Sequence, residues 1–352
     1  MKFRMCLFSF FIIFFLVSGC SKRVVDMEQV SPEEKIVIKF SHVVAESTPK
    51  GMAAQRFASL VRERTGGRVE VQVFANSTLY KDGEEIQALQ SGAVQMIAPA
   101  TSKLSSIYPQ WQVLDLPYAF LNVEAVHRAM EGELGQKLFG SLKQNNMVGL
   151  AFWDSGFKQM TNSKRPLVKP ADFEGLSFRV MINSNVLKRQ FERLHAKPVE
   201  LTFDDLYRYL ESGLIDGQEN TITNIYSRNL FKVQKYLTIS DHGYMGYAVI
   251  ANARFWDGLP PDIKRVIEET LEEVTAWERQ QSLRLAEEDL QKLRLLYKEN
   301  LVELSEDEKK EWQRVLMPLY NEFRKILGDE LIDLVLELNP ALKTSEVQNS
   351  GP

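Results

Sequence analysis

Short β-branched segments alternate with amphipathic helical segments along this chain, and that alternation constrains its fold more than any other feature. Within the first 100 residues, strands are predicted over residues 36–43, 69–73 and 94–98, with helices over 54–61 and 82–91 between them. The β-α-β-α-β order predicts an α/β fold, in which a mostly parallel sheet carries helices on both faces.

A second α/β run begins near residue 147. Strands are predicted over residues 147–153, 176–181 and 247–252, and helices over 183–195 and 202–212. Thr202 with Asp205 three residues later is typical of a capping box at the start of the second helix. At roughly 150 residues per domain, 352 residues predict two domains, and the chain crosses between them more than once.

Residues 262–297 contain no glycine or proline, and their apolar side chains keep helical spacing. One helix of this length would be about 50 Å long, more than a small domain spans. We therefore predict a single helix across both domains, with two helices and an unmarked break as the alternative. Further helices are predicted over 308–327 and 331–338, before Asn339 and Pro340.

The N-terminus resembles an export signal. Lys2 and Arg4 precede a largely apolar region of 13 residues, which is too short for a comfortable membrane span. The sequence Leu-Val-Ser-Gly-Cys at 16–20 resembles a bacterial lipobox, so residues 1–19 are predicted to be a lipoprotein signal peptide and Cys20 to be lipidated. A plain signal peptide or an uncleaved anchor is the alternative. Residues 20–34 are predicted to be a tether and 343–352 a disordered tail.

Composition excludes several classes of protein. With 44% hydrophobic and 26% charged residues, the chain is an ordinary soluble globular protein held at a membrane surface by its anchor. Its net charge of −4 becomes −6 once Lys2 and Arg4 are removed, so the basic surface of a nucleic-acid-binding protein is absent. Cys6 and Cys20 are the only cysteines, which excludes a disulfide scaffold.

The sequence offers little support for catalysis. His42, His127, His195 and His242 are far apart, so no paired-histidine metal motif exists. A nucleophile elbow, a P-loop and a dinucleotide-binding fingerprint are absent too. Lipidation of Cys20 would remove the remaining thiol nucleophile. We therefore predict no enzyme, no metal and no cofactor.

Other residues favour capture of a small anion. Arg179 lies inside an apolar strand, where a buried charge must be paired, and its guanidinium matches a carboxylate. An exposed arginine at a strand end is the alternative. Lys50, Lys103 and Lys158 follow strands, where α/β loops build sites, although each could equally be a surface charge. Asn220 could supply amide hydrogen bonds.

Three aromatic residues, Phe203, Trp153 and Tyr247, fit either the core or a pocket wall. The residues alone thus predict an exported two-domain α/β protein with an anion pocket.

A series of stretches follows an order that is characteristic of one family. They are 40–51, 64–68, 76–80, 89–96, 153–158, 176–180, 214–220, 233–244 and 255–260. Together they resemble the solute-binding proteins of TRAP transporters, the DctP-type family. The resemblance extends from about residue 35 to 342, and Leu-Ile-Asp-Gly-Gln-Glu-Asn at 214–220 is its most recognisable block.

The resemblance implies a two-domain periplasmic-binding-protein fold, type II-like, with a long domain-spanning helix and a ligand between the domains. Domain I would comprise residues 35–155 plus about 246–285, and domain II 156–245 plus about 286–342. The partners it implies are a small organic acid and a TRAP permease in the membrane, and we expect a monomer.

The resemblance also implies residue roles. Arg179 would form the main ion pair with the ligand carboxylate, Asn220 would bind beside it, and Phe203 would line the pocket. Lys158 and Lys103 fall where some members place arginines or lysines around the ligand, and Lys50 resembles a lysine of members that take dicarboxylates. Asn224 and Tyr247 are the weaker assignments. Thr221, where many members have proline, and Met-Ile-Asn at 181–183 depart from the family pattern, and these departures bear on the shape of the pocket rather than on the fold.

A C4-dicarboxylate such as succinate, malate or fumarate fits the four cations, because burying two charges requires that each be paired. Arg179 and Asn220 would grip one carboxylate, and the three lysines would serve the other. A sugar acid or monocarboxylate in the same fold is the first alternative, and a protein that feeds a sensor is the second. An exported enzyme and a purely structural lipoprotein are the remote ones.

Overall fold

The computed structural model of the protein describes residues 35–339 and residue 342. The predicted signal peptide, the lipidated Cys20, the tether and the tail lie outside the described residues. Within the described part, no helix is both long enough and apolar enough to cross a membrane.

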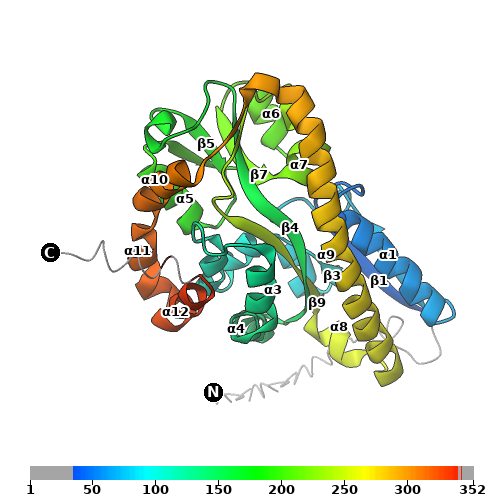
Figure 1. The fold of residues 1–352 in the computed structure, drawn as a ribbon. Helices are drawn as coiled ribbons and strands as arrows, with labels where there is room; N and C mark the ends of the chain where they lie inside the picture. Colours follow the sequence, from blue (N-terminus) through cyan, green and yellow to red (C-terminus); the bar gives the residue numbers. More distant parts are fainter. Residues whose placement is uncertain (1–34, 340–341, 343–352) are drawn as a thin grey trace, which may run out of the picture.

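One ten-stranded sheet in the order β2-β1-β3-β9-β4-β7-β5-β6, with β8 beside β4 and β10 beside β8, organises the described residues (Figure 1). The strands are β1 (Ile36–Ser41), β2 (Val69–Phe74), β3 (Met96–Ile97), β4 (Met147–Asn162), β5 (Ser177–Val180), β6 (Lys197–Glu200), β7 (Gly217–Thr221), β8 (Tyr236–Ile239), β9 (Tyr244–Asn252) and β10 (Leu301–Glu303).

The helices cover both faces of this sheet. They are α1 (Pro49–Arg64), α2 (Glu85–Ser91), α3 (Val123–Glu131), α4 (Glu133–Ser141), α5 (Asn185–Arg193), α6 (Leu206–Glu211), α7 (Ile222–Ser227), α8 (Ala253–Gly258), α9 (Pro261–Tyr297), α10 (Glu306–Leu316), α11 (Pro318–Leu327) and α12 (Asp329–Leu338). The prediction of one long helix is confirmed by α9. The helix predicted over 308–327 is instead two helices, because Pro318 starts a new one.

The sheet is mixed, so the prediction of a mostly parallel sheet was wrong at its centre. Parallel pairs join β1 to β2 and β3, and β5 to β6 and β7. Between these groups, β4 runs antiparallel to β9 over residues 147–157 and to β7 over residues 158–162. We call residues 35–157 and 244–252, which include β1, β2, β3 and β9, the first half. Residues 158–239 and 301–303, which include β5, β6, β7, β8 and β10, are the second half.

A single strand therefore passes through both halves. The register of β4 against β9 shifts between Asp154 and Gly156, and Gly156 has a φ of 113°, which favours glycine. The predicted boundary between residues 155 and 156 coincides with this bulge. The boundaries of the two domains themselves remain a prediction.

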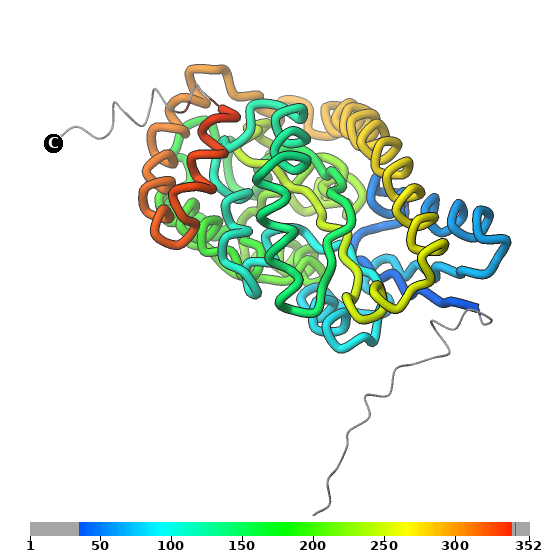
Figure 2. Tube along the Cα trace, turned by 90° about the horizontal axis from the view of Figure 1, so that it is seen from below, coloured from blue at the N-terminus to red at the C-terminus, as the bar shows by residue number. Residues whose placement is uncertain are grey.

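The long helix α9 packs beside β4 and α1, as Figures 1 and 2 show from two directions. Its buried apolar side chains include Ile267, Leu271 and Val274. The indole of Trp153 on β4 donates to the hydroxyl of Thr275 at 3.0 Å, which fixes the helix on the strand. At the other side of the molecule, α12 packs against α3 and α4, so the C-terminal helices contact the first half (Figure 2).

The capping box predicted for α6 is not formed. The helix begins at Leu206, and the hydroxyl of Thr202 bonds to the Asp205 carboxylate at 3.1 Å rather than to the helix backbone. Helices α3 and α4 were not predicted, although Asn122 caps α3 by accepting from the Ala125 N–H at 2.9 Å.

Replacement by alanine should change the free energy of unfolding in opposite directions at two helical glycines. A Cβ on Gly51 in α1 would lie 2.4 Å from the Ala45 carbonyl oxygen, whereas a Cβ on Gly140 in α4 would meet open space. We expect Gly51→Ala to lower the free energy of unfolding by about 2 kcal/mol or more. Gly140→Ala should raise it by about 0.5–1 kcal/mol through helix propensity alone. Urea titrations of both variants check this, and stabilisation by Gly51→Ala would contradict it.

Candidate ligand-binding site

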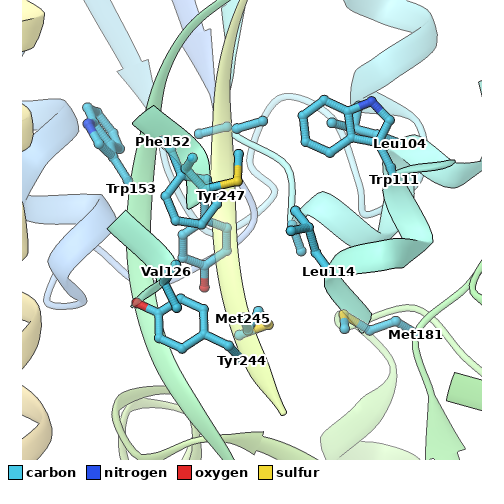
Figure 3. Close-up of a cluster of buried hydrophobic side chains, with 14 of the residues drawn as sticks. Leu104, Trp111, Leu114, Val126, Phe152, Trp153, Met181, Tyr244, Met245 and Tyr247 are labelled. Carbon is cyan, nitrogen blue, oxygen red and sulfur yellow. The ribbon is translucent and has the colours of Figure 1, made fainter. Parts of the chain in front are cut away.

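A narrow cavity lies between the two halves. Its lining consists of five apolar residues, two aromatic residues and five polar or charged residues. They are Val43, Val44, Ala100, Met181, Met245, Phe203, Tyr247, Asp82, Lys103, Arg179, Asn220 and Asn224. Figure 3 shows Tyr247 and Met245 on β9, with Met181 across from them beyond the end of β5.

Arg179 is the charged group of this cavity whose charge is not matched. It lies on β5, is only 2% exposed, and its Nε donates to the Leu201 carbonyl at 3.0 Å. No described carboxylate forms an ion pair with it. Burial lowers the pKa of Arg179 to about 10, although the charge of Glu219 opposes this shift. The guanidinium thus stays charged at neutral pH and has donors to spare for an anion.

Beside Arg179, a chain of hydrogen bonds fixes two asparagine amides. The Asn220 Oδ1 on β7 accepts from the Asn224 Nδ2 at 2.9 Å, and the Asn224 Nδ2 also donates to the Tyr247 hydroxyl at 3.2 Å. Among the described residues, no acceptor bonds the Asn220 Nδ2. This arrangement leaves one amide N–H₂ as a donor in the cavity.

Thr221, the departure from the family pattern, contributes to this arrangement. Its backbone N–H donates to the Asn220 Oδ1 at 3.0 Å, a bond that proline could not make. Its hydroxyl lies 2.9 Å from the Ser155 hydroxyl on β4, and Ser155 in turn lies 3.2 Å from the Tyr247 hydroxyl. Threonine therefore holds the amide in one orientation and ties β7 to the bulge of β4.

Lys103 lines the cavity but already has acidic neighbours. It lies in the 3₁₀ turn Thr101–Ser106, where its ammonium contacts the Asp82 carboxylate and lies 3.7 Å from that of Glu85. Burial lowers the pKa of Lys103, with Lys50 and Arg179 adding repulsion. An ammonium has three donors, so Lys103 can still offer one to a ligand.

Lys50 lies behind the cavity wall rather than in it. Its ammonium donates to the Ala98 carbonyl at 2.7 Å and lies 3.6 Å from the centre of the Tyr247 ring, and Tyr247 lines the cavity. Burial lowers the pKa of Lys50 to about 7, against the attraction of Glu85 and Glu278. Lys50 can therefore act on a ligand only through the electrostatic field of its ammonium and through its contact with Tyr247.

Lys158 belongs to a separate buried cluster. Its ammonium donates to the Glu219 Oε1 at 2.8 Å, and the Glu219 Oε2 lies 2.7 Å from the His242 Nε2. Burial opposes ionisation of Glu219, yet Lys158 and His242 together hold its pKa down at about 2. This cluster does not line the cavity, so the structure does not bring Lys158 together with Arg179 as the sequence analysis expected.

Sequence reasoning missed two acids that shape the site. Glu219 directly precedes Asn220 in the most recognisable block, and that adjacency was a usable signal. No sequence signal pointed to Asp82, because an aspartate before a helix is usually a cap at the protein surface. Among the residues that the structure describes, no group of three or more His, Cys, Asp and Glu side chains could hold a metal ion.

Comparison with known proteins identifies the class of this site. Residues 40–326 match the DctP family, described as bacterial extracellular solute-binding protein, family 7. The chain belongs to this family. The DctP-family fold, with its cavity between two halves and its long helix α9, agrees with the expected two-domain binding-protein architecture.

This DctP-family chain is similar over nearly its whole length to relatives whose names or structures specify a ligand. The chain is 46% identical to the C4-dicarboxylate-binding protein DctB of Bacillus subtilis (strain 168) over 321 residues, 91% of each chain. A TRAP periplasmic solute-binding protein of Shewanella oneidensis with bound succinate is 40% identical, with a TM-score of 0.83 over 87% of this chain and 99% of that one.

A second solved structure represents another ligand class. The sugar acid binding protein DctPAm from Advenella mimigardefordensis strain DPN7T, in complex with galactonate, is 30% identical. Its TM-score is 0.84, and the match covers 88% of this chain and 99% of that chain. The fold is therefore shared by members that hold different carboxylates.

Proposed function

We propose that this protein is the extracytoplasmic solute-binding lipoprotein of a TRAP transporter, and that it captures a C4-dicarboxylate such as succinate, malate or fumarate. The observation that carries the proposal is the buried, positively charged Arg179 in the cavity between the halves, without a carboxylate of the described residues to pair with it. A buried charge without a counter-ion is costly, so an anionic ligand is the natural partner.

One carboxylate would accept two parallel hydrogen bonds from Arg179, with the free Asn220 amide beside it. The other would lie near Lys103, which can spare a donor, and within the field of Lys50. Lys158 would act only indirectly, by holding Glu219 away from the cavity. The 46% identical relative and the succinate-bound structure both support this choice of ligand.

The ligand would be bound between the halves, released unchanged and delivered to the membrane permease. We propose that no bond of the ligand is made or broken, and that the protein acts outside the cytoplasm as a monomer. Lipidation at Cys20 would keep it at the membrane surface. Metabolic labelling with a fatty acid, compared with a Cys20→Ser variant, tests the anchor.

A sugar acid is the second candidate, and the galactonate-bound relative favours it. Such a ligand carries one carboxylate and several hydroxyls. It would use Arg179 in the same way, but it would rely on Asn220, Asn224 and Tyr247 for its hydroxyls instead of Lys103.

A thermal-shift panel separates the two candidates. At 100 times Kd, a ligand adds about 2.7 kcal/mol to stability, which raises the melting temperature of a protein this size by roughly 4 °C. We expect that rise with succinate, malate and fumarate but not with sulfate at equal ionic strength. A rise with galactonate alone would replace the dicarboxylate by a sugar acid. No rise with any carboxylate would refute the proposed function.

A further inference from the structure

Polar bonds between two loops cross from one half to the other at the edge of the cavity. The first loop joins β2 to α2 and carries Ser77 and Asp82. The second joins β6 to α6 and carries Phe203 and Asp204. Each loop follows the carboxyl end of a strand at its own side of the sheet, so the two meet only because the halves are together. We call these four residues the clasp.

The bonds of the clasp are reciprocal. The Asp82 Oδ2 accepts from the Phe203 N–H at 2.7 Å, and the Asp204 Oδ2 accepts from the Asp82 N–H at 2.8 Å. The Asp204 Oδ1 also accepts from the Ser77 hydroxyl at 2.6 Å. Each half thus presents a carboxylate to a backbone donor of the other, and hydrogen bonds to charged acceptors are among the stronger ones in proteins.

Two cations offset the repulsion between the carboxylates. Lys103 contacts Asp82 from the first half, and the Arg228 Nη2 lies 3.9 Å from the Asp204 Oδ1 in the second. Arg228 also crosses the boundary, because it donates to the Val43 carbonyl at 3.1 Å and stacks 4.5 Å from the Phe203 ring. Val43 and Phe203 both line the cavity, so these bonds position its wall.

The first loop stores backbone strain at this point. Asn76 and Ser77 have φ angles of 54° and 57°, in the left-handed region that non-glycine residues rarely adopt. Their N–H groups bond to the carbonyls of Val44 and His42, which holds the strained turn in place. Strain of this kind tends to gather at ligand clamps, and here it turns the Ser77 hydroxyl toward Asp204.

We infer that Asp204 is a positioning residue that holds the closed state around the bound anion and thereby sets how slowly the ligand leaves. This inference rests on the proposed function. Closing the halves forms the clasp but also buries Arg179, and the two effects oppose each other until an anion pairs with the guanidinium. Asp204 itself touches no ligand, since it is outside the lining of the cavity, whereas Asp82 and Phe203 are part of that lining.

Asp204→Asn tests this role by removing the charge and by turning one oxygen into a donor. We expect succinate to dissociate about tenfold to hundredfold faster, as loss of charged hydrogen bonds predicts, with the association rate within about twofold of wild type. Stopped-flow tryptophan fluorescence on the purified protein measures both rates. A merely structural role would lower the ligand-free melting temperature instead, which we expect to stay unchanged.

Two further variants complete the test. Asp205→Asn is the matched control, because Asp205 lies in the same loop but bonds to Arg208 and Thr202 of its own half. Ser77→Ala removes one arm of the clasp from the opposite side and should show the same change in dissociation rate if Asp204→Asn does not fold.

The outcomes separate the inference from the proposed function. If succinate binds the wild type and leaves the clasp variants at the wild-type rate, the clasp has no role and the proposed function stands. If neither succinate nor galactonate binds the wild type, the proposed function fails and the inference falls with it. Faster dissociation of succinate from the clasp variants, with Asp205→Asn at the wild-type rate, establishes the role of Asp204.

Discussion

Replacement of Arg179 by lysine is expected to weaken succinate binding about hundredfold without unfolding the protein. A lysine ammonium keeps the charge, but it loses the planar fork that gives two parallel hydrogen bonds to one carboxylate. Each hydrogen bond to a charged group contributes about 1.5–3 kcal/mol. The bond from Nε to the Leu201 carbonyl, which orients the fork, is lost as well. Isothermal titration calorimetry with succinate measures the loss.

Replacement of Arg179 by methionine should separate binding from stability. Burial lowers the pKa of this guanidinium, which means that the ligand-free fold is destabilised by its charge. We therefore expect Arg179→Met to abolish binding and to raise the melting temperature of the ligand-free protein. Arg62→Lys, on the exposed surface of α1, is the control and should change neither quantity. Wild-type affinity in Arg179→Lys would refute the assignment.

Glu219→Ala should cause the largest loss of stability in this protein, about 3–5 kcal/mol. Its carboxylate holds both the Lys158 ammonium and the His242 ring, and all three side chains are buried. Removing one partner of a buried ion pair leaves the other charge without compensation, which costs far more than an exposed pair is worth. Urea titration of Glu219→Ala measures the loss, with the exposed Glu211→Ala as the control.

The same cluster predicts acid sensitivity. Lys158 and His242 lower the pKa of Glu219 from its ordinary 4.5 to about 2, against the effect of burial. Because the folded pKa is depressed, this stabilisation is fully present above about pH 4.5 and is lost as the pH falls toward 2. Burial also lowers the pKa of His242, so protonation of this ring in acid costs stability as well. Acid therefore destabilises the fold through both members of the pair. Between pH 5 and 3, the wild type should lose more stability than Glu219→Gln does.

Local patterns predicted most of the elements, but not how the strands pair. The apolar spacing along 262–297 was sufficient to predict α9, because the spacing of a helix is a property of neighbouring residues. The antiparallel pairing of β4 with β9 joins residues about 100 positions apart, and no local pattern records it. The helix break at Pro318 was visible in the sequence, since proline cannot continue a hydrogen-bonded helix.

The site was predictable where a residue type conflicted with its surroundings. Arg179 stood out because a charge inside an apolar strand needs a partner, and the structure places it in the cavity. Lys158 was chosen because it follows a predicted strand, yet its partner Glu219 lies 61 residues away on β7, so only the fold reveals that its charge is already paired. Asp82 and Asp204 resembled ordinary surface acids, because nothing local distinguishes a carboxylate that bonds across a boundary.

The continuous strand β4 limits how the two halves can move. A translation that pulled them apart would break hydrogen bonds along the ladder, whereas a twist about the strand at Gly156 would preserve them. Opening of the two halves is thereby reduced to one rotational degree of freedom, a twist about the axis of β4. The two halves have one relative angle to fix instead of six rigid-body coordinates, so they lose little relative orientational entropy when they close around a ligand.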